Sequence, residues 1–160
     1  MEAEQDQRMM RRCLELADQS RRNGESAVGS LIVLDGEVLA EGLEATLEEL
    51  DPTAHSELLA IRAACRRLGH TDLSGAEMFT TVEPCLSCAY AIRATGISRV
   101  VIGTDAGEIG TFGPGARYPY LADPGFANWG PPPEVVMGLM ADESRRLRGL
   151  PRGPQGDSGS

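Results

Sequence analysis

A histidine and a glutamate one residue apart, followed later by a Cys-x-x-Cys pair, constrain this chain more than any other feature. His55 and Glu57 form the first half, and Cys85 and Cys88 form the second half directly after Pro84. One imidazole and two thiolates supply three of the four ligands of a tetrahedral zinc ion, and catalytic zinc sites keep the fourth position for water. We therefore predict a catalytic zinc site with His55, Cys85 and Cys88 as its ligands.

Glu57 follows the predicted histidine ligand closely enough to place a carboxylate beside a zinc-bound water. Zinc lowers the pKa of such a water from about 15.7 to roughly 7, so hydroxide is available at neutral pH. A carboxyl group in a closed pocket can have its pKa raised toward neutrality, and it can then carry a proton to a ring nitrogen and to a departing amine. We predict that Glu57 is the catalytic proton carrier of a hydrolytic reaction.

The cysteine pair has two other interpretations. A Cys-x-x-Cys pair also occurs in redox sites and as half of a four-cysteine zinc site, but a redox site leaves His55 and Glu57 without a role. Cys13 and Cys65 stand alone within helical apolar patterns, which favours small buried side chains over metal ligands. His70 is expected to be exposed or to cap a helix.

Length and composition suit one compact domain. The chain has 160 residues, of which 41% are hydrophobic, so we expect a single domain with the zinc site at 1–150 and a disordered Pro/Gly/Ser-rich tail at 151–160. No stretch approaches the roughly 18 apolar residues of a membrane span, and the N-terminus lacks a secretion-signal pattern. Free thiolates must stay available to the metal, which favours a cytoplasmic location.

The charge of the chain bears on its partners. The formal net charge is −9, whereas nucleic-acid binding normally needs a positive surface that neutralises phosphates. All 15 basic residues are Arg, which excludes a Schiff-base lysine. The arginine clusters are mixed with Glu and Asp, so solvated helix faces are favoured over a basic patch. We therefore expect a small free substrate, no membrane contact and no nucleic-acid partner.

Apolar spacing predicts alternating helices and strands. Both predicted ligand sets lie in the first turns of helices, and the cysteine pair follows a strand end, where open α/β sheets usually bind ligands. Helices are predicted at 4–22, 54–68, 84–95 and 141–148, and strands at 31–34, 38–40, 78–82, 99–102 and 135–137.

Residues 103–133 form an irregular stretch rich in Gly, Pro and aromatic residues. A long aromatic loop in a small domain is typical of a lid or a binding loop. Packing over the sheet edge or a dimer contact is the alternative. Candidate pocket residues in this loop are Asp105, Phe112, Asp123, Phe126 and Trp129.

Two stretches resemble the cytidine-deaminase-like superfamily. They are DPTAHSE at 51–57 and TVEPCLSC at 81–88. Within that superfamily the chain is most similar to the branch that holds bacterial guanine deaminase, fungal-type cytosine deaminase and tRNA adenosine deaminase. The resemblance covers about residues 5–148.

The resemblance implies a three-layer α/β/α sandwich around a central mixed five-stranded sheet, hydrolytic deamination with release of ammonia, and a homodimer. It also implies that His55, Cys85 and Cys88 hold Zn²⁺ and that Glu57 carries protons. The substrate-binding candidates are Ser56, whose backbone amide would lie near the attacked carbon together with that of Cys85, and Glu44, Pro84, Phe112 and Trp129.

Glu44 marks a departure from that branch, in which a Gly-x-Asn after the second strand supplies an Asn that hydrogen-bonds the substrate ring. The matching stretch here is Gly42-Leu43-Glu44. Because an ionised carboxylate only accepts hydrogen bonds, we hypothesise a substrate rich in N–H donors, such as an aminopurine, a triazine or a pterin-like ring. The alternative is that Glu44 points to solvent and another residue contacts the base.

Three functions are therefore compared. The preferred one is a zinc-dependent hydrolytic deaminase of a small amino-substituted N-heterocycle, which could be a nucleobase, a nucleoside, a triazine or a pterin-like ring. The alternative is a tRNA-specific adenosine deaminase or a deaminase of single-stranded nucleic acid, whose binding would weaken steeply with salt. A non-enzymatic protein with a structural zinc is disfavoured, because such a site has no need of Glu57.

Overall fold

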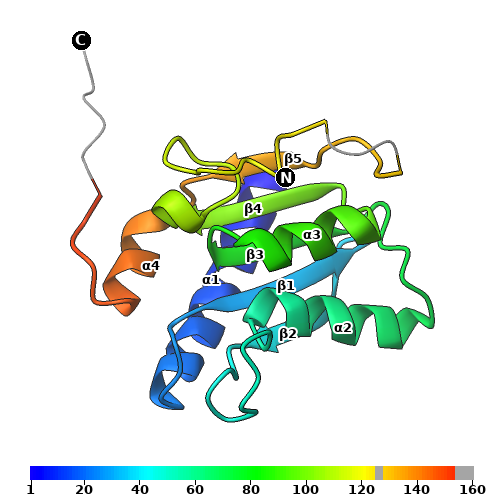
Figure 1. Ribbon diagram of the computed structural model, residues 1–160. Coiled ribbons are helices and arrows are strands. Elements are labelled where there is room, and N and C mark those ends of the chain that lie inside the picture. Colours follow the sequence, from blue (N-terminus) through cyan, green and yellow to red (C-terminus); the bar gives the residue numbers. More distant parts are fainter. Residues whose placement is uncertain (125–127, 154–160) are drawn as a thin grey trace.

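The computed structural model describes residues 1–124 and 128–153, and a five-stranded sheet of order β2-β1-β3-β4-β5 forms its centre (Figure 1). The strands are β1 (Gly29–Leu34), β2 (Glu37–Leu43), β3 (Glu77–Val82), β4 (Arg99–Thr104) and β5 (Glu134–Met137). The helices are α1 (Glu2–Arg22), α2 (Ser56–Leu68), α3 (Leu86–Thr95) and α4 (Ala141–Leu147), with a 3-10 turn at Gly107–Ile109. The predicted α/β architecture with a mixed five-stranded sheet is confirmed.

The sheet is mixed because only its second half is parallel. β1 pairs antiparallel with both β2 and β3, whereas β3, β4 and β5 run parallel to one another. The carboxyl ends of β3 and β4 therefore reach the same edge, where Val82 pairs with Thr104. Pro84 and Cys85 leave β3 at this edge, which places the start of α3 there.

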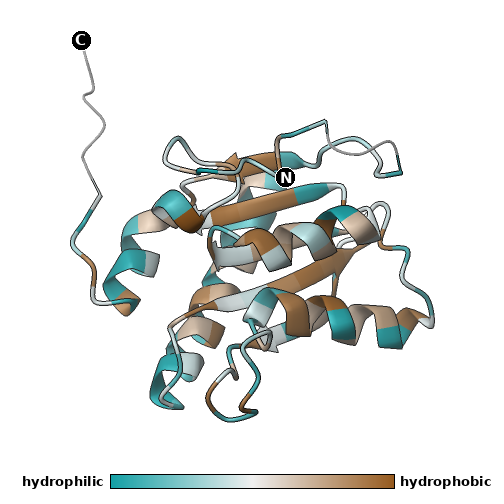
Figure 2. Ribbon diagram, viewed as in Figure 1, coloured by the Kyte–Doolittle hydropathy of each residue, from teal (hydrophilic) through white to brown (hydrophobic). Residues whose placement is uncertain are grey.

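Two hydrophobic clusters pack the helices against opposite faces of the sheet. Alternate strand residues such as Ile32, Met78 and Val100 pack beneath α2 and α3. The intervening residues, including Leu31 and Phe79, pack against α1 and the segment before α4. Figure 2 shows the resulting apolar strands between amphipathic helices. This period-2 alternation produces the three layers.

Both helices that carry the predicted ligands begin two residues later than expected. α2 begins at Ser56, with His55 as an extended N-cap at φ −73° and ψ 147°. α3 begins at Leu86, with Cys85 as an extended N-cap at φ −78° and ψ −177°. The expectation that His55 and Pro84 lie inside the first helical turns is therefore wrong, because N-cap residues take non-helical backbone angles.

Cys13 is buried as expected, whereas Cys65 is only partly buried. Gly96 ends α3 in the left-handed conformation at φ 77°, which a residue without Cβ adopts at little cost. Among the described residues, no helix has both the length and the apolar content to cross a membrane. The candidate Phe126 and the tail at 154–160 lie outside the described residues.

Gly42 of β2 lies directly against the start of α2. A Cβ at this position would overlap the Ser56 carbonyl oxygen and approach the Ala60 amide nitrogen to 3.0 Å. The lack of a side chain at Gly42 therefore allows α2 to pack closely on the sheet and fixes the height of its first turn.

We expect Gly42→Ala to lower the free energy of unfolding by about 1–3 kcal/mol, because the added methyl overpacks this contact. Urea unfolding followed by circular dichroism measures the loss. Gly130→Ala is the matched control, because a Cβ there meets no atom within 4 Å, and its effect should stay within about 0.5 kcal/mol. Equal losses in the two variants would contradict the close packing at Gly42.

Candidate active site

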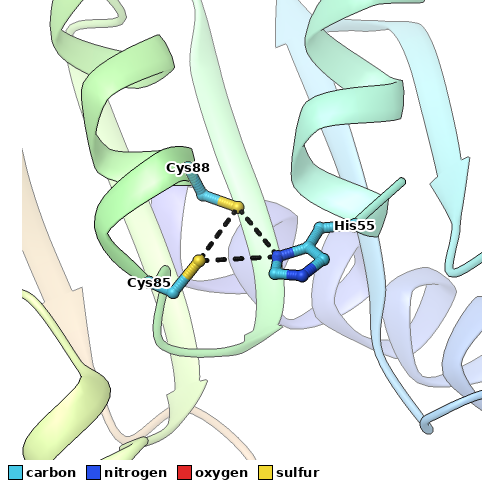
Figure 3. A group of neighbouring side chains, drawn as sticks. All are labelled: His55, Cys85 and Cys88. Carbon is cyan, nitrogen blue, oxygen red and sulfur yellow. Dashed lines mark hydrogen bonds between the residues drawn. The ribbon is translucent and has the colours of Figure 1, made fainter. Parts of the chain in front are cut away.

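The three predicted metal ligands converge between the starts of α2 and α3 (Figure 3). His55 Nδ1 lies 3.5 Å from Cys85 Sγ and 3.5 Å from Cys88 Sγ, and the two Sγ atoms are 3.7 Å apart. These residues form a group that could hold a metal ion. The convergence joins two stretches that are well separated in the sequence.

The spacing of the three ligand atoms fits one zinc ion. Tetrahedral zinc has Zn–S distances of about 2.3 Å and Zn–N distances of about 2.0–2.1 Å, so it separates two sulfurs by about 3.8 Å and a sulfur from a nitrogen by about 3.6 Å. The observed separations of 3.7 Å and 3.5 Å agree with this geometry. The group found among the described residues contributes three donors, so a tetrahedral ion held there would keep one position for a further ligand.

Cys85 and Cys88 interact electrostatically as a pair. The two Sγ atoms are hydrogen-bonded to each other, and this interaction lowers the pKa of Cys85 to about 4. The same hydrogen bond, together with burial, raises the pKa of Cys88. The start of α3 favours thiolate at both positions, and metal coordination deprotonates a thiol outright.

Glu57 lies beside the ligands in a buried position, with 3% of its surface exposed. Its Oε2 is 3.7 Å from Cys88 Sγ, and the hydroxyls of Ser56 and Thr80 hydrogen-bond its two carboxyl oxygens. Burial raises the pKa of Glu57 to about 7. A carboxyl group with this pKa can accept and release a proton near neutrality.

Glu44 is also buried, and it caps the first turn of α2. Its Oε1 accepts the Ser56 backbone N–H at 2.7 Å, and burial raises the pKa of Glu44. Only 8% of Glu44 is exposed, so the residue does not extend into solvent. Because Ser56 already supplies a donor to one carboxyl oxygen, the replacement of Asn by Glu does not by itself require an amino-rich substrate.

Glu83 fixes the loop that follows β4 to the turn before Cys85. Its buried carboxylate accepts backbone N–H groups from Ala106, Phe112 and Gly113 at 2.7–3.0 Å. Thr111 adds a hydrogen bond to the Pro84 carbonyl at 2.7 Å. The Phe112 ring packs against the core cluster beneath α2 and α3, so this candidate contributes to the core.

Arg93 of α3 holds the second half of the aromatic loop. Its guanidinium donates to the carbonyls of Tyr120 and Asp123 at 2.7 Å and lies 5.2 Å from the centre of the Trp129 ring. Trp129 also meets Tyr90 edge to face at 5.7 Å. The candidate Trp129 therefore lies against Arg93 and Tyr90 of α3, a contact that no sequence pattern predicted.

A hollow of about 560 Å³ opens beside the ligand Cys85. Three residues that sequence reasoning missed line it, namely Ile109, Arg117 and Tyr118. Their only sequence signal is their place within the irregular loop. A larger hollow of about 750 Å³ lies between α1 and β2, but it contains none of the metal ligands, so its volume does not mark it as the site.

Comparison with known families identifies this arrangement. Residues 3–104 match the model of the cytidine and deoxycytidylate deaminase zinc-binding region, which is more than half of the 160 residues. The chain belongs to this family. The predicted superfamily, the zinc-dependent hydrolase class and Zn²⁺ as cofactor are thereby confirmed.

Several relatives of this deaminase-family chain are tRNA enzymes. The chain is 34% identical to the tRNA-specific adenosine deaminase of Haemophilus influenzae, over 88% of this chain and 79% of the relative. It is 42% identical to that of Aquifex aeolicus, over 53% of this chain and 56% of the relative. The alignment with the Aquifex aeolicus enzyme thus spans about half of that protein's length.

Solved structures give two comparisons. A structure from a study of A-to-I editing by tRNA:A34 deaminases superposes with a TM-score of 0.80 at 33% identity, over 88% of this chain and 98% of the other. Guanine deaminase from Bacillus subtilis superposes with a TM-score of 0.59 at 35% identity, over 61% of this chain and 62% of the other.

The expectation of a small free substrate with no nucleic-acid partner is contradicted by the tRNA-specific relatives. The prediction was wrong because it was based on the net charge of the chain. A net charge of −9 averages over the whole chain, whereas phosphate contacts depend on local arginines. Arg146 in α4 and Arg148 directly after α4 are two exposed arginines.

We expect the purified protein to bind one zinc ion and each single replacement His55→Ala, Cys85→Ala or Cys88→Ala to remove most of it. The affinity of the site for zinc depends on each of its ligands, so the loss of one ligand weakens binding. Elemental analysis after dialysis against a weak chelator measures the content. Cys65→Ala is the matched control and should keep its zinc, because Cys65 lies outside the ligand group. Unchanged zinc content in the ligand variants would overturn the assignment.

Proposed function

We propose that this chain is a tRNA-specific adenosine deaminase, which converts adenosine in an anticodon loop to inosine with release of ammonia. The observation that carries the proposal is the buried Glu57 carboxyl group beside a three-ligand metal site. The tRNA-specific relatives support the choice of substrate.

The proposed reaction needs residues that bind zinc and a residue that transfers protons. His55, Cys85 and Cys88 hold zinc, which when bound supplies a water with a pKa near 7. Glu57 accepts the proton of the attacking water and delivers it to ring N1 as the oxygen adds at C6. Glu57 then passes the second proton to the 6-amino group, which leaves as ammonia. Adenosine and water thus give inosine and ammonia.

A local group of arginines supports contact with RNA phosphates. Ser144 of α4 hydrogen-bonds the Thr81 carbonyl of β3, and Arg145 reaches Thr104 at the end of β4. These contacts place the end of α4 at the sheet edge from which the cysteine ligands emerge. The exposed residues Arg146 and Arg148 follow at this edge, where their charges would neutralise phosphates of a bound RNA.

A guanine deaminase is the second candidate, and the superposition with the Bacillus subtilis enzyme favours it. Both candidates use the same zinc and the same proton carrier on a purine C–NH₂ group. For either candidate we propose that Glu44 contacts the substrate. Its Oε1 is bonded to the Ser56 N–H, and the other carboxyl oxygen would make this contact. Substrate selection alone separates the two.

The homodimer and the cytoplasmic location stay predictions. For the homodimer we place the contact on an exposed apolar patch beside the site, where side-chain exposure ranges from 43% to 69%. The patch consists of Leu86, Tyr90, Ile109 and Tyr118.

We expect zinc-loaded protein to form inosine in a tRNA anticodon stem–loop that carries adenosine at the wobble position. Release of ammonia is measured in parallel over guanine, adenosine, cytosine, a triazine and a pterin. Turnover of guanine without turnover of the stem–loop would replace the tRNA proposal with the second candidate. Turnover of neither RNA nor any heterocycle would overturn deamination itself.

Glu57→Gln is the matched control for this assay, because it keeps the side-chain volume but cannot carry the proton. We expect at least a thousandfold loss of turnover with full zinc content, since general acid–base catalysis contributes about 10²–10⁴-fold. Activity within tenfold of the unsubstituted protein would remove Glu57 from the mechanism.

Glu57 also sets the expected pH dependence. It acts first as a base, so it must be ionised when water attacks, and its raised pKa means that acidification protonates it early. Burial raises its pKa to about 7. We expect kcat/KM to fall about tenfold per pH unit below that pKa. A rate that rises from pH 7 to pH 5 would contradict this role.

A further inference from the structure

Two buried hydroxyl residues face each other across β1 and β3, beneath the start of α2. Ser30 and Thr80 are direct partners in the antiparallel register, and neither is exposed. Their neighbours on this face of the sheet are apolar, including Ile32, Met78 and Ile102. A polar cross-strand pair in this layer therefore calls for an explanation.

The two hydroxyls form a closed ring of hydrogen bonds with Ser56 and Glu57. Ser30 Oγ lies 2.9 Å from Thr80 Oγ1 and 2.8 Å from Ser56 Oγ. Thr80 Oγ1 then reaches Glu57 Oε1 at 3.2 Å and the Val82 carbonyl oxygen at 3.1 Å, and Ser56 Oγ reaches Glu57 Oε2 at 3.3 Å. Each carboxyl oxygen of Glu57 thus lies beside a hydroxyl. The three hydroxyls share three protons among these contacts, and Ser30 contacts both of the other hydroxyls.

Stability alone does not account for these side chains. A buried hydroxyl costs free energy unless it is hydrogen-bonded, and replacing both partners of a buried hydrogen bond by apolar groups of similar shape is nearly neutral or stabilising. Alanine at Ser30 and valine at Thr80 would match the apolar surroundings. We therefore relate the hydroxyls to Glu57, the one member of the ring with a part in the proposed reaction.

The geometry indicates how the hydroxyls affect the Glu57 carboxyl group. A glutamate side chain has three rotatable bonds, and Glu57 lies at the first turn of α2 with its Oε2 3.7 Å from Cys88 Sγ. Two separate hydroxyl contacts, one on each oxygen, fix both the position and the rotation of the carboxyl plane. A group that is held in this way needs no reorganisation when it receives a proton.

We propose that Ser30, Ser56 and Thr80 are positioning residues that hold the Glu57 carboxyl group toward the metal site. The proposal rests on the deaminase chemistry proposed for Glu57 and is independent of which base is deaminated. It assigns a role in the reaction to two strand residues, Ser30 and Thr80, that belong neither to the metal-ligand group nor to the lining of the hollow beside Cys85.

Thr80→Val and Ser30→Ala test the proposal, with the unsubstituted protein's best substrate from the panel above as probe. We expect kcat to fall about 10–100-fold in each zinc-loaded variant, as for other groups that orient a reacting residue. KM and zinc content should stay unchanged, whereas the urea midpoint should fall slightly, because each single replacement leaves a buried polar partner without one of its hydrogen bonds. Thr80→Ser keeps the hydroxyl and should restore most of kcat.

Thr81→Val is the matched control from the same strand. Thr81 is also fully buried, but it points to the α1 side, where its Oγ1 accepts the Gly29 N–H at 3.2 Å. Its loss leaves that N–H without the hydroxyl, so we expect lower stability with kcat unchanged. Loss of kcat in Thr80→Val together with loss of stability in Thr81→Val supports a positioning role. Equal kcat in Thr80→Val and the unsubstituted protein would overturn it.

A readout that needs no substrate separates failure of this proposal from failure of the proposed function. Crystal structures of zinc-loaded unsubstituted protein and of the Ser30→Ala/Thr80→Val double variant would show the Glu57 side chain directly. We expect a single conformer in the former and a rotated or split carboxyl group in the latter. One identical Glu57 conformer in both would contradict positioning, even if no substrate of the enzyme had been found.

Discussion

The site depends on two helix starts being held within ligand distance of each other. His55 is the N-cap residue of α2 and Cys85 is the N-cap residue of α3. These helices lie side by side on one face of the sheet (Figure 1). The sheet sets their separation, because α3 leaves the end of β3 and α2 packs directly on Gly42 of β2. The match between the ligand separations and tetrahedral zinc is a consequence of this rigid support.

Burial gives the acidic groups around the metal site their different roles. Glu57 is buried beside the ligands, and its raised pKa suits a residue that exchanges protons. Glu44 caps α2 through the Ser56 amide, and Glu83 holds three amides of the loop after β4. A chain with net charge −9 thus uses buried carboxylates as structural acceptors and, in the proposed reaction, as the proton carrier.

Much of this could be predicted from the sequence, because the informative residues act locally. The spacing of His55, Glu57 and the cysteine pair predicted the three side chains that converge as a possible metal site, and apolar periodicity located each helix and strand of the sheet. Contacts that depend on distant pairing could not be predicted. The Ser30–Thr80 pair follows from strand register, and the burial of Arg93 follows from the path of a loop. The tRNA relatives show that net charge was a poor guide to partners.

A crystal structure of the zinc-loaded protein tests the central claim most directly. The account predicts one zinc bound by His55, Cys85 and Cys88, with a solvent oxygen as the fourth ligand at hydrogen-bond distance, about 2.6–3.2 Å, from Glu57. A fourth protein side chain on the metal, or a Glu57 carboxyl group turned away from the fourth ligand, would contradict it.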